Sequence, residues 1–408
     1  MAFFLLVLPQ KVCYIVDIMK ELSLSKRVSQ VKPSPTLAIT ARAREMKKKG
    51  IDVISFGVGE PDFDTPVNIK DAAIAGINKG FTKYTPSSGI AELKNAISEK
   101  LGRENRLRVT PEQIIVSCGA KHALYNTLQA LCNEGDEVIV ISPYWVSYIE
   151  MISLAGGTPK IVPAREDNDY VVDPQAIKKS ISSRTKAIMV NSPSNPTGAV
   201  YPRTVLEAIA KIALSEKIFL ISDEIYEKLI YGGEKHFSIG SISDDIADLT
   251  FTINGVSKTY SMTGWRIGYV AGPMEIVKKI SALQSHSTSN PTSISQLAAL
   301  EAIRGDQGIV EKMKDEFIKR RDYMEKRINS FKKISCVKPK GAFYIFCNIA
   351  PSKMDSVKFS SRLLEEARVA CVPGAAFGSD DHIRLSFATG MGNIKNGLDR
   401  IEKWLDSI

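Results

Sequence analysis

Short apolar runs alternate with longer amphipathic stretches along the middle of this chain. Each run has four or five residues, rich in β-branched and other apolar side chains, which is typical of strands buried on both faces of a sheet. The stretches between them have helical spacing, so we expect parallel strands connected by helices. The predicted fold class is α/β, with a large domain whose mostly parallel sheet lies between helices. The predicted strands are 114–117, 137–141, 187–191, 218–222 and 250–254, and the predicted helices are 121–131, 144–154, 174–181 and 202–213.

The alternation ends near residue 292, and the remainder has a different order of elements. A helical tract at 293–331 precedes a strand at 342–347, a helix at 357–366, a strand at 383–387 and a final helix from Met391. This order predicts a smaller α+β domain. The predicted divisions are 1–18, an N-terminal extension; 19–60, an N-terminal arm and part of the small domain; 61–292, the large domain; and 293–408, an interdomain helix and the small domain.

The first 18 residues are more apolar than the polar segment that begins at Met19. They lack the basic region and the small-residue cleavage site of a signal peptide, and they are too short to span a bilayer. We expect a dispensable extension or a mis-called start, with weak membrane contact as the alternative.

Composition narrows the class of protein. A hydrophobic content of 44% with a mean hydropathy of −0.06 predicts a soluble globular protein, for which no membrane partner is expected. The scattered cysteines predict a cytoplasmic location. The net charge of +9 comes partly from segments such as 312–333, where charges of both signs alternate. Such a segment is more typical of a solvated helix face than of a nucleic-acid site, so no nucleic-acid partner is expected. The six cysteines form no CxxC pair and the four histidines show no metal-ligand spacing, which predicts reduced thiols and no metal site.

The stretch 254–266, NGVSKTYSMTGWR, places Lys258 in a loop between the apolar runs 249–253 and 267–271. Loops at the ends of buried strands carry the chemistry of many α/β proteins. A lysine there, near the second cation Arg266, can have its pKa lowered from about 10.4 and act as an amine nucleophile. Arg266 could also bind a phosphate through two hydrogen bonds. The alternative is a solvated surface lysine. A Schiff-base lysine beside a phosphate-binding arginine suggests pyridoxal phosphate as cofactor.

Polar residues follow other predicted strands. Asn195 lies in the turn 191–198, where turn chemistry explains the prolines and glycine but not the amide. Asp223 ends a strand, and Tyr226 stands three residues on at a predicted helix start. Asp223 is either a helix N-cap or the carboxylate that keeps a pyridine nitrogen protonated, with Tyr226 reaching the ring oxygen.

Two further loops have the features of a cofactor site. Gly119 and Ala120 open a predicted helix, and helix N-termini bind phosphate. Trp145 follows a strand and could stack on a flat ring, although core packing is the alternative. The run GVGEPDF at 57–63 lacks the third glycine of a dinucleotide loop, so that interpretation is rejected.

Seven motifs in their order along the chain resemble the class I aminotransferases of the pyridoxal-phosphate-dependent fold type I family. The resemblance runs from about Leu22 to the C-terminus and is similar in detail to the aspartate/prephenate aminotransferase branch. It implies a homodimer with shared active sites and a large domain that binds the cofactor. The motifs are GEPDFDTP, KYTPSSGI, SPYWVSY, NSPSNPTGAVYP, SDEIYE, SKTYSMTGWRIGY and HIRLSFAT.

By this resemblance, Lys258 forms the Schiff base, Asp223 pairs with the pyridine nitrogen, and Tyr226 and Asn195 bind the ring oxygen. Trp145 stacks on the ring, and the phosphate is bound by Gly119, Ala120, Arg266 and Tyr84 of the partner subunit. Many relatives place a phosphate-binding serine three residues before the lysine, where this chain has Gly255, so phosphate contacts from this loop differ or are lost. The implied substrate-binding residues are Gly59, Lys121, Trp145, Asn195, Arg384, Lys32, Ser34 and Thr36.

The implied reaction is ping-pong transamination between aspartate or glutamate and 2-oxo acids, with prephenate as a further substrate. Arg384 would bind the α-carboxylate, and Lys121 with Ser34 and Thr36 the distal one, while Lys32 resembles a position tied to prephenate use. The alternatives are an aminotransferase of different specificity or a β-lyase on the same fold. A ligand-sensing module without catalysis would normally carry a DNA-binding segment, for which the first 30 residues are too short.

Overall fold

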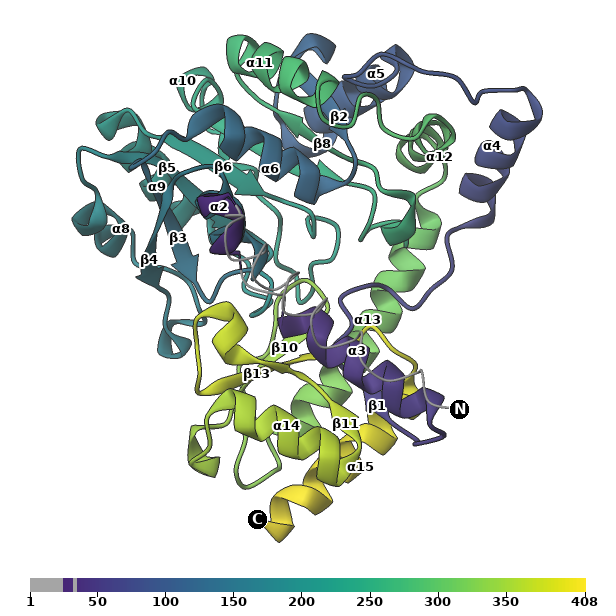
Figure 1. Ribbon diagram of the computed structural model, residues 1–408, viewed down its shortest axis with the longest axis vertical. Helices are drawn as coiled ribbons and strands as arrows, with labels where there is room; N and C mark the ends of the chain where they lie inside the picture. Colours follow the sequence, from purple (N-terminus) through teal and green to yellow (C-terminus); the bar gives the residue numbers. More distant parts are fainter. Residues whose placement is uncertain (1–24, 32–34) are drawn as a thin grey trace, which may run out of the picture.

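The computed structural model describes residues 25–31 and 35–408, and its larger lobe is built on a seven-stranded sheet (Figure 1). Every strand pair is parallel except those of β8, which runs antiparallel to both of its neighbours. The mostly parallel sheet predicted from the apolar runs is therefore confirmed. In spatial order the strands are β2 (Ile114–Ser117), β8 (Gly268–Ala271), β7 (Thr250–Gly255), β6 (Phe219–Asp223), β5 (Thr185–Asn191), β3 (Glu137–Ser142) and β4 (Thr158–Pro163).

Helices cover both faces of this sheet because alternate strand residues point to opposite sides. Val138 and Val140 of β3 pack in one buried cluster, whereas Ile139 and Ile141 pack in another. The first face is covered by α6 (Ala120–Leu131), α7 (Ser147–Leu154) and α11 (Met274–Ser285). The second is covered by α8 (Pro174–Ser180), α9 (Arg203–Glu216) and α10 (Asp244–Ala247), and near β2 by α4 (Val67–Asn78), α5 (Ala91–Lys100) and α12 (Ser293–Arg304).

The smaller lobe, yellow-green at the bottom of Figure 1, contains an antiparallel sheet and the C-terminus. Its strand order is β12 (Val372–Pro373), β13 (His382–Ser386), β10 (Tyr344–Asn348) and β9 (Ser335–Cys336). A separate parallel pair joins β1 (Ile54–Ser55) to β11 (Val369–Ala370), so the chain before residue 60 contributes to this lobe. The accompanying helices are α3 (Pro35–Lys48), α13 (Gly308–Ile328), α14 (Ser356–Ala367) and α15 (Met391–Ser407). The short helix α2 (Lys26–Ser29) lies instead by α7 of the larger lobe.

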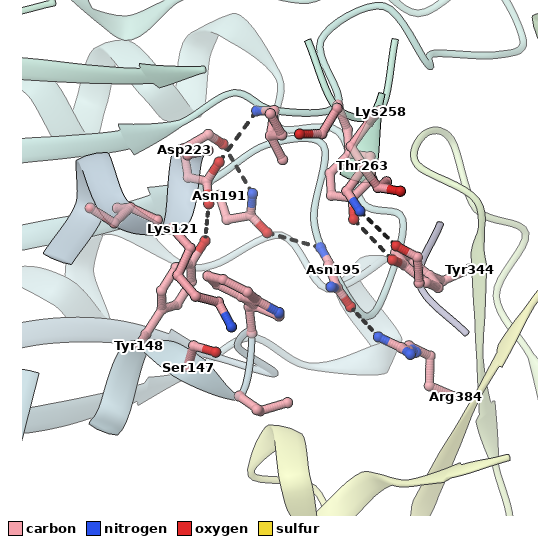
Figure 2. A pocket seen from close by; sticks show the side chains of 18 of the residues that line it. Lys121, Ser147, Tyr148, Asn191, Asn195, Asp223, Lys258, Thr263, Tyr344 and Arg384 are labelled. Carbon is pink, nitrogen blue, oxygen red and sulfur yellow. Dashed lines mark hydrogen bonds between the residues drawn. The ribbon is translucent and has the colours of Figure 1, made fainter. Parts of the chain in front are cut away.

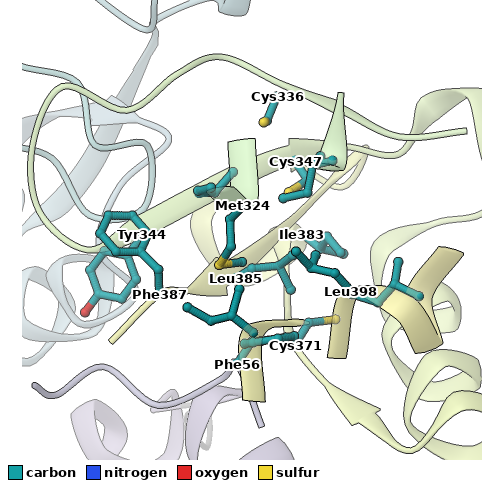
Figure 3. Packing of buried hydrophobic residues seen from close by; sticks show 14 of the residues in the cluster. Phe56, Met324, Cys336, Tyr344, Cys347, Cys371, Ile383, Leu385, Phe387 and Leu398 are labelled. Carbon is teal, nitrogen blue, oxygen red and sulfur yellow. The ribbon is translucent and has the colours of Figure 1, made fainter. Parts of the chain in front are cut away.

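The core of the smaller lobe joins residues far apart in sequence (Figure 3). Phe56, Met324, Leu385 and Leu398 come from four different segments and are all buried in one cluster. Tyr344 belongs to the same cluster, although its ring also reaches the cavity described below. The strand that carries Tyr344 is therefore held rigidly by its packing.

Several predicted element boundaries are wrong, among them the end of α9 at Glu216 rather than at 213, and three of the errors have an identifiable cause. The tract 293–331 is two helices separated at Gly305, and Gln307 Nε2 donates there to the carbonyls of Ala302 and Gly305. Helix α7 begins at Ser147 rather than at 144, because the backbone N–H of Tyr144 donates to the carbonyl of Phe377 instead.

The third wrong boundary concerns Tyr226, which lies in a turn and not at a helix start. Asp223 is therefore not a helix cap. Its Oδ1 accepts a hydrogen bond from the backbone N–H of Ile225 at 3.3 Å, which closes a local turn.

Among the described residues, no helix is long and apolar enough to cross a membrane. The five cysteines in this part of the chain are free thiols, four of them buried and Cys118 half-buried; Cys13 lies outside it.

Candidate active site

A cavity of about 330 Å³ opens where the carboxyl ends of the parallel strands face β10 and β13 of the smaller lobe (Figure 2). Strands β5, β6 and β7 end beside it at Asn191, Asp223 and Gly255. Such an edge is where α/β folds bind ligands. Ten of the residues singled out from the sequence line the cavity: Gly59, Ala120, Lys121, Trp145, Asn195, Asp223, Tyr226, Lys258, Arg266 and Arg384.

Lys258 stands in the loop after β7, and its Nζ donates to the carbonyl of Gly59 at 2.6 Å. Burial lowers the pKa of Lys258 to about 8, with Arg384 and Arg266 acting in the same direction and the Glu60 carboxylate opposing them. Burial, and not Arg266 as predicted from the sequence, is therefore the main cause of the lowered pKa of Lys258. A sizeable fraction of the amine is therefore neutral near pH 8, as a nucleophile or a proton acceptor requires.

Asp223 is 4% exposed and accepts a hydrogen bond from Tyr148 Oη at Oδ2, across 2.6 Å. Burial raises the pKa of Asp223 to about 6, and the hydrogen bond from Tyr148 works in the opposite direction. Because burial also raises the pKa of the Tyr148 phenol well above its usual range, Tyr148 remains a donor. Asp223 is thus a buried carboxylate with two donors, aimed at the cavity (Figure 2).

Arg384 projects from β13 and is 2% exposed. Its Nη1 donates to Asn195 Oδ1 at 3.0 Å and its Nη2 to the carbonyl of Gly57 at 2.9 Å, while its buried Nε has no hydrogen-bond partner among the described residues. The Tyr344 and Phe377 ring centroids lie 4.3 and 5.1 Å from the guanidinium. A buried guanidinium with an unused donor is suited to binding a carboxylate.

Asn191 orients two of these groups, although the sequence argument did not include it. Its Oδ1 accepts from the backbone N–H of Asn195 at 2.9 Å, and its Nδ2 donates to the carbonyl of Asp223 at 3.0 Å. Asn191 therefore ties the turn after β5 to the end of β6.

The corner around Gly119 has almost no free space. Gly119 has φ +93°, and a Cβ there would lie 2.4 Å from Arg266 Nη2. A Cβ on Gly268 would lie 2.1 Å from the backbone nitrogen of Ala120. Arg266 adopts φ 58° and its Nη1 donates to the carbonyl of Thr263 at 2.8 Å. Backbone and guanidinium thus meet at the start of α6, where the free N–H groups of the helix and the Arg266 cation are both suited to attract an anion.

Position 255, three residues before the lysine, does not line the cavity. A Cβ there would lie 2.9 Å from Gly268 Cα and 3.0 Å from the carbonyl oxygen of Ile267, so a serine would need the neighbouring strand to move. Ser257 does line the cavity.

Lys121 and Trp145 form the wall next to α7. The Lys121 ammonium lies 4.9 Å from the centroid of the Trp145 ring, and burial together with Arg266 lowers the pKa of Lys121. Lys121 is therefore a cation held over an aromatic face at the cavity wall.

Tyr148 and Tyr344 also line the cavity, although neither was predicted from the sequence. Tyr148 lies in the motif SPYWVSY, where only the tryptophan attracted attention, and Tyr344 lies in an apolar strand whose pairing with β13 cannot be read from one sequence. Five predicted site residues do not line the cavity in the part of the chain that the structure describes: Gly119, which stands directly before α6, Tyr84, Lys32, Ser34 and Thr36. Tyr84 is 92% exposed, Lys32 and Ser34 lie outside the described residues, and of Thr36 only its position in α3 is described.

A buried charged cluster lies behind the turn that carries Asp223 and Tyr226. Glu224 accepts the hydroxyls of Ser222 and Ser238, both at 2.8 Å, and contacts His236 Nε2 at 2.8 Å. Glu227 is paired with Lys100. Although burial alone would raise it, the charges of Lys100 and His236 lower the pKa of Glu227 to about 2. Glu224, Glu227 and His236 were not foreseen as a group, and they anchor the turn from its rear side.

Comparisons with known proteins identify the family of the chain. The family model for aminotransferase class I and II matches residues 51–401. An aspartate aminotransferase from Bacillus sp. (strain YM-2) is 50% identical over 392 residues, covering 95% of this chain and 100% of that protein. The aspartate/prephenate aminotransferase of Thermus thermophilus is 46% identical over 385 residues, covering 94% and 98%. Among solved structures, the aspartate aminotransferase from Thermus thermophilus with maleate has a TM-score of 0.91 at 45% identity, covering 94% and 99%. The chain therefore belongs to the aminotransferase class I and II family.

Proposed function

We propose that this protein transfers the amino group between aspartate or glutamate and 2-oxo acids, using pyridoxal phosphate bound in the cavity. The observation that carries the proposal is Lys258, an amine with a pKa of about 8 in the same cavity as a buried carboxylate, Asp223, and a buried guanidinium, Arg384. When bound, pyridoxal phosphate supplies an electron sink for negative charge at the substrate Cα. Lys258 Nζ then takes the Cα proton.

The residues present fit this cofactor. Asp223 would pair with the pyridine nitrogen, Tyr226 and Asn195 with the ring oxygen, and Trp145 would stack on the ring. The crowded corner at Gly119, where a Cβ would strike Arg266, supports a phosphate site built from backbone and guanidinium. Gly119, Ala120 and Arg266 are the residues proposed to bind the phosphate.

The proposed substrates carry two carboxylates. Arg384, with Asn195 and Gly59 beside it, would bind the α-carboxylate, since its Nε has no partner among the described residues. Lys121 would bind the distal carboxylate, together with Ser34 and Thr36. The names of the relatives as aspartate or aspartate/prephenate aminotransferases support this specificity, and prephenate is proposed as a further substrate with Lys32 contributing. No feature of the cavity favours a β-lyase.

We also propose a homodimer with shared active sites. Val67, Ile74 and Ile77 are exposed apolar residues of α4, and Tyr84 stands in the segment that follows. Burying such a patch against a second copy would be favourable. Tyr84 of the partner subunit would then reach the phosphate.

An absorption spectrum tests the proposed function. Addition of glutamate to the purified cofactor-bound protein should change the visible absorption of the cofactor, and oxaloacetate should restore it. Alanine serves as the control donor and should react much more slowly. A protein whose spectrum does not respond to glutamate or aspartate is not a transaminase of this specificity.

A further inference from the structure

Tyr344 touches two parts of the active site at once. It opens β10, is 1% exposed and lines the cavity. Its hydroxyl lies 2.9 Å from the hydroxyl of Tyr226, and its ring centroid lies 4.3 Å from the Arg384 guanidinium (Figure 2). The two contacts involve different ends of one rigid side chain, so moving one end would move the other.

The position of Tyr344 is tightly fixed. A Cβ on Gly59 would lie 2.8 Å from the Tyr344 hydroxyl, which shows how closely that hydroxyl approaches the Gly59 backbone. The ring of Phe343 packs against it at 4.7 Å between centroids, and Tyr226 makes an edge contact at 5.9 Å. Tyr344 cannot turn its hydroxyl elsewhere without leaving this packing.

The number of protons on the two hydroxyls decides which phenol donates in the hydrogen bond between Tyr226 and Tyr344. Each phenol has one proton to donate, and within residues 25–31 and 35–408 the hydroxyls of Tyr226 and Tyr344 have no other hydrogen-bond partner than each other. Burial raises the pKa of both phenols, so both keep their proton. If Tyr226 donates to an anionic ring oxygen, its bond to Tyr344 can form only when Tyr344 is the donor.

The ring of Tyr344 has a separate role. Arg384 is held at Nη1 by Asn195 and at Nη2 by the carbonyl of Gly57, which leaves the faces of the guanidinium to be fixed by aromatic rings. An aromatic face beside a desolvated guanidinium is attractive and restricts its orientation. The ring can do this without its hydroxyl.

We propose that Tyr344 is a positioning residue whose hydroxyl donates to Tyr226, leaving the Tyr226 proton for the cofactor's ring oxygen, and whose ring holds Arg384 ready for the substrate α-carboxylate. The inference rests on the proposed function. By this inference one side chain aligns both Tyr226, which would contact the cofactor, and Arg384, which would bind the substrate α-carboxylate.

Two variants separate the hydroxyl from the ring. Tyr344→Phe keeps the ring and removes the donor, and Tyr344→Leu removes both. The first readout is the pH at which the cofactor-bound protein changes its visible absorption, which reports the proton held between Lys258 Nζ and the ring oxygen. The second is the dissociation constant of maleate, a dicarboxylate that cannot react. Neither measures turnover.

For Tyr344→Phe, the absorption midpoint should rise by roughly a few tenths of a pH unit, because Tyr226 becomes a weaker donor without Tyr344 behind it. Maleate affinity should stay within about twofold of the unmodified protein, since the ring remains. For Tyr344→Leu, the midpoint should rise similarly and maleate should bind roughly 5- to 30-fold more weakly.

The direction of the first shift decides the hydroxyl's role. If Tyr226 donates to Tyr344 instead, removing the Tyr344 oxygen would free the Tyr226 proton for the cofactor, and the midpoint would fall. A fall or no change therefore overturns the claim for the hydroxyl, and unchanged maleate affinity in Tyr344→Leu overturns the claim for the ring. The unmodified protein is the control: if it lacks a pH-dependent absorption change or does not bind maleate, the proposed function itself fails.

Discussion

The phenol of Tyr148 donates to Oδ2 of Asp223 across 2.6 Å, and the ring of the same tyrosine meets the Trp145 ring edge-on with 5.3 Å between centroids. One residue of α7 thus supports both the carboxylate proposed to pair with the pyridine nitrogen and the indole proposed to stack on the ring. This gives Tyr148 a measurable role in cofactor binding.

Tyr148→Phe should weaken binding of pyridoxal phosphate to the apoprotein by roughly 10- to 150-fold near pH 7, the loss expected for one hydrogen bond to a charged group. Without this donor the pKa of Asp223 should rise, so fewer molecules carry the carboxylate that the ring nitrogen needs. The measurement is a fluorescence titration of the apoprotein with pyridoxal phosphate and with its 1-deaza analogue, whose ring has carbon in place of nitrogen.

The deaza analogue should lose little affinity in Tyr148→Phe. Tyr170→Phe is a matched control, because Tyr170 is also buried but hydrogen-bonds to His382 outside the cavity. Equal losses for both ligands would mean that Tyr148 acts only through packing.

Asp223→Asn should stabilise the apoprotein at neutral pH while abolishing most activity. The pKa of Asp223 is raised to about 6 in the folded state, above the value of about 3.9 for an exposed aspartate, so the folded state binds the extra proton and loses stability as pH rises from 4 to 6. The asparagine variant lacks this penalty and should be about 1–3 kcal/mol more stable above pH 7, with the advantage vanishing near pH 4. The measurement is the free energy of unfolding in urea of both apoproteins at pH 4 and at pH 8. A difference in this free energy that is the same at both pH values would contradict the account.

The transaminase kcat of Asp223→Asn should fall roughly 100- to 1,000-fold, as for other key electrostatic groups.

The sequence predicted the sheet and most of the cavity because both depend on local signals. Strands such as β5 and β6 contain continuous apolar runs. Asp223 ends a strand, and Asn195 and Lys258 each follow one, so a parallel sheet brings them to one edge. Tyr344 could not be found in this way, because it depends on the register that sets Phe346 opposite Arg384 in the antiparallel pair β10–β13. The start of α7 was misplaced for a similar reason, since a contact with distant Phe377 determines the conformation of Tyr144.

Glu227→Gln should destabilise the protein by about 3–5 kcal/mol at pH 7, because the buried Lys100 ammonium keeps its bond to Asn105 Oδ1 but its nearest remaining carboxylate is that of Glu104, at 3.9 Å. The pKa of Glu227 is depressed to about 2, so its contribution is present above the unfolded value of about 4.3 and is lost as pH falls towards 2. The thermal unfolding temperatures of the parent protein and of Glu227→Gln should therefore differ less at pH 3.5 than at pH 7. The double variant Glu227→Leu with Lys100→Met should recover much of the stability, and a single variant as stable as the parent would show that the pair does not anchor this turn.

Lys121→Ala should lower kcat/KM for aspartate, glutamate and prephenate by about 10- to 200-fold, because the distal carboxylate loses its cation. Slow turnover of alanine or phenylalanine should fall much less, since Arg384 still binds the carboxylate common to all substrates. Lys32→Ala should weaken prephenate more than aspartate. Equal losses of kcat/KM for monocarboxylic and dicarboxylic substrates in Lys121→Ala would show that Lys121 does not determine substrate specificity.

The central claim is that Lys258 is the amine that bonds to the cofactor, and the cavity offers a direct competitor. Lys121 also lines it and also has a lowered pKa. Borohydride reduction of the cofactor-bound protein, followed by peptide mass spectrometry, identifies the lysine that carries the cofactor. The account predicts label on Lys258 alone, with Lys258→Ala and Lys258→Arg unlabelled and without turnover, the arginine because its guanidinium stays charged. Label on Lys121, or full turnover by Lys258→Ala, would contradict it.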